Sequence, residues 1–239
     1  MGEILLISGR ILKSVLIFLV ILIAFLFLKS SVIYLALDNN RLPVLARIVI
    51  YFVLSYSIVL IGIWGVRRIN VSNLFEFKKS YLFFGMLCSL LFSMLTFGLT
   101  LLSYRHGYIL GHLNQVSFHL TAGNVFNNIS MGKHNKLNLL VLADACTFQP
   151  IIEEIIFRGI LISYMVEYQK LAPVLAITLG AGLFMLAHTF NTFNPEILCF
   201  GLLAGFLFTK TKSLIPGIAF HMSGNMLIAI LNMLTFSFS

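Results

Sequence analysis

The sequence is poor in charged residues and in proline, and each shortage excludes a class of protein. Charged residues make up only 10% of the 239 residues, against about a quarter in typical soluble domains. Hydrophobic residues reach 59%, more apolar surface than a soluble chain of this length buries. The 5 prolines and 23 phenylalanines favour long lipid-facing helices over a loop-rich fold. The composition therefore predicts an integral membrane protein.

Cysteine is also scarce. Cys88, Cys146 and Cys199 lie in or beside apolar segments and have no CxxC spacing, which excludes a disulfide framework and a zinc knuckle and predicts free, buried thiols. The net charge of +8 comes from short Lys and Arg clusters between apolar runs. Such clusters indicate membrane topology and lipid headgroup contacts, so the expected partner is the lipid bilayer and no nucleic acid is expected.

Apolar runs of the length that crosses a bilayer, about 20 residues, recur along the chain. The sequence predicts an all-α, polytopic membrane helix bundle of about seven transmembrane helices, near residues 11–37, 44–66, 81–103, 137–168, 171–190, 196–209 and 214–236. The run that begins at Val15 resembles a signal peptide but has no small-residue cleavage site, so we expect an uncleaved first span.

The chain divides into an N-terminal region, residues 1–136, and a C-terminal region, residues 137–239. The first holds three spans and a polar loop over 104–136, whose histidines fit no compact metal-ligand spacing such as HExxH: His106, His112, His119 and His134. Counting Lys and Arg by connection gives nine against six for an N-terminus inside the cell. This count places the connections 67–79 and 210–212 on the same side of the membrane.

Three ionisable residues interrupt an otherwise apolar stretch: Glu153, Glu154 and Arg158. Charges at membrane depth are costly unless they are paired or face a polar cavity, so they usually mark function. On an α-helix, residues four apart share a face, so we expect Glu154 to pair with Arg158 while Glu153 points to a different sector. The paired carboxylate is suited to orient the helix, and the other carboxylate is suited to act as a general base.

Two later spans repeat this spacing. Phe184 and His188 lie four apart, as do His221 and Asn225, so each pair shares a helical face. Together with Glu153 they form the minimum set for activating water against a peptide carbonyl, with His221 and Asn225 as donors to the developing oxyanion. Glycines in 180–182 and 201–205 predict close packing of the two helices that carry them.

Each of these features also has a structural reading. A histidine inside a membrane often only hydrogen-bonds between helices, a buried Glu–Arg pair often only fixes helix register, and Asn225 could cap or bridge. Their conjunction in three late spans favours a functional site, because ionisable residues inside a membrane are rare.

The motifs resemble the three-part signature of the CAAX protease and bacteriocin-processing family, also called Abi, of intramembrane endopeptidases. The resemblance covers residues 150–225 and every motif position: Glu153, Glu154 and Arg158, then Phe184 and His188, then His221 and Asn225. It makes residues 137–239 the expected catalytic transmembrane domain.

The resemblance implies that Glu153 and His188 activate the hydrolytic water, that His221 and Asn225 stabilise the oxyanion, and that Glu154, Arg158 and Phe184 support them. A zinc-dependent and a metal-free glutamate mechanism are both open, because two histidines and a carboxylate suit zinc and the sequence has no HExxH helix.

A membrane-associated protein or peptide is the expected substrate, in CAAX-like processing, peptide maturation or bacteriocin self-immunity, and the expected location is a bacterial cell membrane. The alternatives are a non-catalytic regulator or scaffold, which would show erosion of a motif, and a proton-coupled transporter, which would show internal repeats. Neither feature is present in the sequence.

Overall fold

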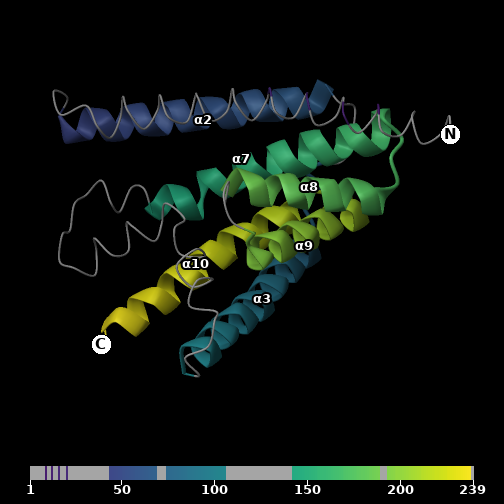
Figure 1. Ribbon diagram of the computed structural model, residues 1–239. Coiled ribbons are helices and arrows are strands. Elements are labelled where there is room, and N and C mark those ends of the chain that lie inside the picture. The colour runs from purple at the N-terminus through teal and green to yellow at the C-terminus, as the bar shows by residue number, and fades with distance from the viewer. Residues whose placement is uncertain are drawn as a thin grey trace. The chain divides into compact units, whose positions relative to one another are not determined.

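The computed structural model describes residues 43–68, 74–105, 142–188 and 193–237, together with a few single positions before them. Every regular element in these ranges is a helix (Figure 1), as the composition predicts. Almost all of the predicted span 11–37 and of the loop 104–136 lies outside the described residues. The chain divides into two compact units, which are described one at a time: residues 1–72 with 152–176, and residues 73–151 with 177–239.

In the first unit, helix α2 (Val44–Arg68) packs against η2 (Ile155–Ile162). Its buried residues Tyr51, Ser55 and Val59 recur every four positions along one face, as expected for a helix with one packed side. A methyl group at Gly62 would lie 3.0 Å from Cγ2 of Ile155. Glycine at this position therefore allows α2 to approach the helix that follows the two glutamates.

The predicted span 137–168, which the structure describes from residue 142 on, is helical but is not one regular α-helix. A short helical segment at 142–146 is separated by a turn at Thr147 from α7 (Phe148–Glu154). Pro150 explains the break, because it has no N–H to donate and its ring clashes with the carbonyl four residues earlier.

After Glu154 the backbone becomes π-helical, in η2 and then in η3 (Tyr164–Tyr168). The Ser163 N–H donates to the carbonyl of Arg158, five residues earlier. The periodicity of the sequence did not predict the π-helix, because the side chains of η2 are buried almost throughout. A stretch that is apolar on all sides does not distinguish one helical period from another.

In the second unit, helices α3 (Lys79–Arg105), α9 (Pro195–Thr211) and α10 (Ile215–Ser237) pack on one another (Figure 1). Small residues at four-residue spacing on α3 face α10. A methyl group at Gly85 would overlap the Pro216 carbonyl and lie 2.9 Å from Cβ of Ala219, and one at Gly224 would lie 3.3 Å from Oγ of Ser89. Small residues thus bring the two helix backbones into close contact, as in small-xxx-small membrane packing.

Among the described helices, one segment, Lys79–Leu99, is long and apolar enough to cross a membrane by length and composition. Large apolar side chains such as Phe83, Leu91 and Leu95 are exposed on it. Shorter apolar helices lie at Val49–Trp64, Pro173–His188 and Ile215–Ile230. The three cysteines are free, as predicted, but none of them is buried: Cys88 and Cys146 are partly exposed and Cys199 is exposed.

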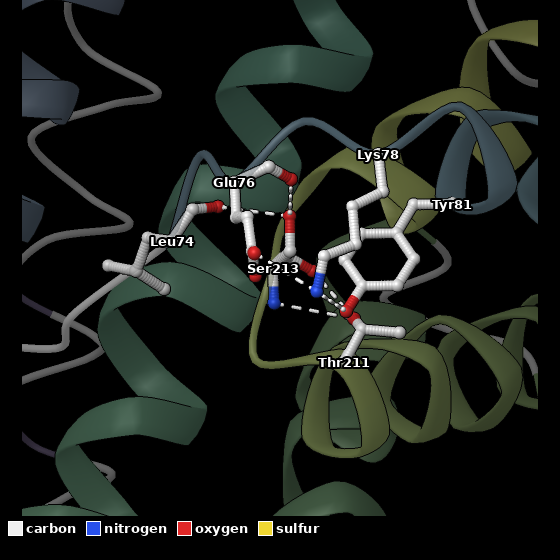
Figure 2. Close-up of polar contacts among 6 residues, drawn as sticks. All are labelled: Leu74, Glu76, Lys78, Tyr81, Thr211 and Ser213. Atoms are coloured by element: carbon white, nitrogen blue, oxygen red, sulfur yellow. Dashed lines mark hydrogen bonds and ion pairs between the residues drawn. The ribbon is translucent and has the colours of Figure 1, made fainter.

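The connection before α3 and the connection between α9 and α10 are joined by hydrogen bonds (Figure 2). The Leu214 N–H donates to the Leu74 carbonyl over 2.7 Å. The buried Ser213 hydroxyl donates to the Glu76 carbonyl over 2.9 Å and accepts from the Ile215 N–H over 3.2 Å. These two connections therefore lie at the same end of the unit, as the Lys and Arg count assumed.

An exposed ion pair lies beside this junction. The Lys78 ammonium is 3.0 Å from the Glu76 carboxylate and 3.3 Å from the Tyr81 hydroxyl (Figure 2). The hydrogen bond to Glu76, supported by the one to Tyr81, raises the pKa of Lys78. Lys78 therefore carries its positive charge at neutral pH, in the cluster of cations that flanks α3.

Candidate functional site

The predicted site residues are divided between the two units. Glu153, Glu154 and Arg158 belong to the first. The second holds the aromatic and imidazole residues together with the asparagine: Phe184, His188, His221 and Asn225. The geometry below is given within each unit.

The ion pair that the i, i+4 spacing predicts is present. Nη1 of Arg158 lies 3.0 Å from Oε1 of Glu154, and both side chains are almost completely buried. The pair forms although the backbone between its members passes from α7 into π-helix η2. A buried pair in this position has no solvent to replace either partner, so it fixes the start of η2.

Glu153 is also buried, with 4% of its surface exposed. Its negative charge acts on the Arg158 guanidinium in addition to that of Glu154. The direct contact of Arg158 is with Glu154, as the spacing predicts.

His188 is the last residue of α8 (Pro173–His188), one turn after Phe184. Its Nδ1 lies 2.8 Å from the Phe184 carbonyl oxygen. A carbonyl oxygen only accepts, so Nδ1 carries the hydrogen and the neutral imidazole has its lone pair on Nε2. The Phe184 ring lies 4.3 Å from the imidazole. The main chain and the ring of Phe184 thus set the tautomer and the orientation of His188.

His221 lies on α10 and is buried, with 5% of its surface exposed. Its imidazole is 6.0 Å from the Phe184 ring and 4.6 Å from the Phe200 ring, measured between centroids. Phe184 therefore contacts both imidazoles, and the structure brings His188 and His221 to one aromatic cluster in the second unit.

Asn225 lies one turn after His221 on α10, and its Nδ2 donates to the Ala145 carbonyl over 2.7 Å. Ala145 belongs to the helical segment just before the turn at Thr147. The hydrogen bond ties the segment that leads toward the glutamates to α10. An amide NH₂ has two hydrogens, so one donor remains for the predicted oxyanion role.

Phe200 is the residue that sequence reasoning missed. It stacks on Phe220 at 4.6 Å and on Phe184 at 5.7 Å, as well as meeting His221. One phenylalanine among 23 has no distinguishing spacing. The only nearby feature that the sequence analysis singled out was Gly201. The close packing predicted for the helices that carry residues 180–182 and 201–205 is confirmed at this glycine, because a methyl group there would lie 2.9 Å from Cα of Ala181.

Metal binding was left open by the sequence. Within the described ranges, no group of three or more His, Cys, Asp or Glu side chains comes together in the way that holds a metal ion.

Comparison with known proteins identifies the segment that holds these motifs. Residues 135–227 match the family model described as type II CAAX prenyl endopeptidase Rce1-like. All seven predicted site residues fall inside this match, and the resemblance read from the motifs is confirmed. No curated protein and no solved structure matches the chain.

Proposed function

Because the chain carries a segment of the Rce1-like family at residues 135–227, we propose that it is an intramembrane endopeptidase in which Glu153 and His188 activate water. The observation that carries this proposal is the complete set of acid, imidazole and amide groups inside the matched segment. Buried Glu153 and His221, with 4% and 5% of their surfaces exposed, suit chemistry in a water-poor site.

Hydrolysis follows from the roles of these groups. Glu153 accepts a proton from a water molecule held by Nε2 of His188, and the water oxygen attacks the peptide carbonyl carbon. The carbonyl oxygen becomes an oxyanion, which the imidazole of His221 and the second amide hydrogen of Asn225 stabilise. The tetrahedral intermediate then breaks its C–N bond, and protonated Glu153 returns its proton to the leaving amine.

The supporting residues act through these groups. The Glu154–Arg158 pair, 3.0 Å long and buried, holds the backbone that carries Glu153. The Phe184 carbonyl holds His188 in the tautomer whose lone pair is on Nε2. Orientation of this kind contributes to catalysis because a misplaced group loses its advantage over bulk water.

The substrate in this proposal is a membrane-associated protein or peptide, processed in a CAAX-like cleavage, a peptide maturation or a bacteriocin self-immunity pathway. The bundle has about seven spans, and it resides in a bacterial cell membrane. The helical and apolar character of the described elements supports the membrane location.

The decisive test replaces Glu153 with glutamine, which keeps the size of the side chain and removes its basicity. Purified Glu153→Gln, reconstituted in liposomes, should accumulate and insert like the wild type and show no cleavage of a peptide library that the wild type cleaves. Glu167→Gln is the matched control, because Glu167 is an exposed carboxylate in η3. Wild-type turnover in Glu153→Gln would refute the assignment of the base.

The same cleavage assay on the wild type measures whether hydrolysis depends on a metal ion. Loss of cleavage on chelation, with return on adding zinc, would assign Glu153 and the histidines to a metal-bound water. Cleavage that persists after chelation would assign them to the metal-free scheme.

A further inference from the structure

We propose that Phe200 is a positioning residue for His221, so that the site extends to α9, which carries none of the motif residues. The expected effect of Phe200 on turnover rests on the proposed function. The placement of His221 by Phe200 concerns only the second unit and is tested separately.

The contacts of Phe200 distinguish it from an ordinary packing residue. Its ring centroid lies 4.6 Å from the His221 imidazole, with the two planes inclined at 63°. On its other sides the ring stacks on Phe220 at 4.6 Å and on Phe184 at 5.7 Å. Phe200 thus joins His221 to Phe184, the residue that orients His188.

The local sequence of α9 explains how the ring reaches this place. Asn194 caps the helix by accepting from the N–H groups of Glu196 and Ile197, and Pro195 fixes its first turn. Gly201 then brings the α9 backbone against Ala181 of α8. Phe200, next to this point of closest approach, is carried to the ring of Phe184 on α8.

The position of the ring has a consequence for His221. An imidazole held at 63° to an aromatic ring has fewer side-chain orientations open to it than one in an apolar cavity. The ring also covers His221, which is 95% buried by its surroundings. Removing the ring should therefore free the imidazole to turn away and expose it to reagents.

The test compares Phe200→Leu with Phe92→Leu. Phe92 belongs to the same aromatic cluster, with ring contacts to Phe200 at 6.2 Å and to Phe220 at 5.9 Å, so it controls for loss of packing. Phe200→Tyr keeps the ring and serves as the conservative variant. Phe200→Met, of similar volume, replaces Phe200→Leu if that variant fails to accumulate.

Two readouts are taken on full-length protein in liposomes. The first is kcat and KM, where Phe200→Leu should lose about ten- to a hundredfold in kcat with little change in KM, as expected for a misplaced group. Phe200→Tyr and Phe92→Leu should stay near wild type. The second is the rate at which diethyl pyrocarbonate modifies His221, followed by mass spectrometry, which should rise in Phe200→Leu alone.

The two readouts distinguish failure of the proposed function from failure of the positioning role of Phe200. If the wild type cleaves no substrate, the proposed function fails, and the modification rate still tests the position of His221. If Phe200→Leu and Phe92→Leu change kcat and the modification rate equally, Phe200 only packs the core and the proposal is overturned. Wild-type kcat and modification rate in Phe200→Leu would overturn it as well.

Discussion

At the scale of single residues, the buried polar groups of the candidate site are oriented by specific partners, because water is not available to replace those partners. Glu154 and Arg158 are both nearly inaccessible to solvent, and in a membrane neither finds water if the other is removed. Asn225 and His188 are instead fixed by main-chain carbonyls, those of Ala145 and Phe184. Side chains held by the backbone are oriented whether or not a substrate is present.

Arg158→Ala should destabilise the protein by about 3–5 kcal/mol, because it leaves the Glu154 carboxylate buried without its cation. Thermal unfolding in detergent measures this loss. The double variant Glu154→Gln, Arg158→Met removes both charges and should recover much of the stability. Equal melting temperatures for the wild type and Arg158→Ala would contradict a stabilising ion pair.

Asn225→Ala should lower turnover by about a hundredfold or more, the usual loss for one oxyanion donor, and should also cost about 1–2 kcal/mol of stability through the lost bond to Ala145. Substrate capture should change little, because the oxyanion exists only in the transition state. Asn225→Asp keeps the shape but not the donor, so it should behave alike. A variant that loses stability but keeps turnover would make Asn225 an anchor alone.

At the scale of helices, the second unit depends on backbones that approach closely. Gly85 and Gly224 lie on opposite sides of the α3–α10 contact, and Gly201 makes the α8–α9 contact. Apolar side chains bring little net gain to helix association in lipid, because lipid tails are equally apolar, so van der Waals packing between small residues carries the association.

Gly85→Ala should destabilise this contact by about 1–3 kcal/mol, because the added methyl group would overlap the Pro216 carbonyl and the chain would have to move. Gly98→Ala is the matched control on the same helix, since nothing lies within 4 Å of its added methyl group. It should be neutral or slightly stabilising through helix propensity. Equal losses in both variants, measured by thermal unfolding, would argue against packing at Gly85.

At the scale of the whole molecule, the junction of Leu74, Glu76 and Ser213 fixes the relation between two connections far apart in sequence (Figure 2). Both carry lysines, and hydrogen bonds between them require that they emerge on one side of the membrane. The positive-inside rule predicts that this side is the cytoplasmic one.

Single cysteines placed at Lys78 and Lys212 in a cysteine-free background should therefore react with a membrane-impermeant maleimide from the same side of sealed vesicles. The two positions lie on either side of the junction, beside Glu76 and Ser213. Labelling before and after the vesicles are opened measures the side of each cysteine. Reaction from opposite sides would contradict the junction.

The sequence alone predicted the membrane class, the helical fold and the motif residues, because composition, periodicity and spacing are local properties. It predicted the Glu154–Arg158 pair for the same reason, since partners four apart meet on any helix of nearly that period. It did not predict the π-helix after Glu154, where apolar residues on every side erase the periodic signal, nor the place of Phe200, which is one ring among many. These features depend on the packing of distant helices. The hydrogen bond of Asn225 to Ala145, 80 residues apart, and the contact of Phe200 with His221 exist only once those helices have packed.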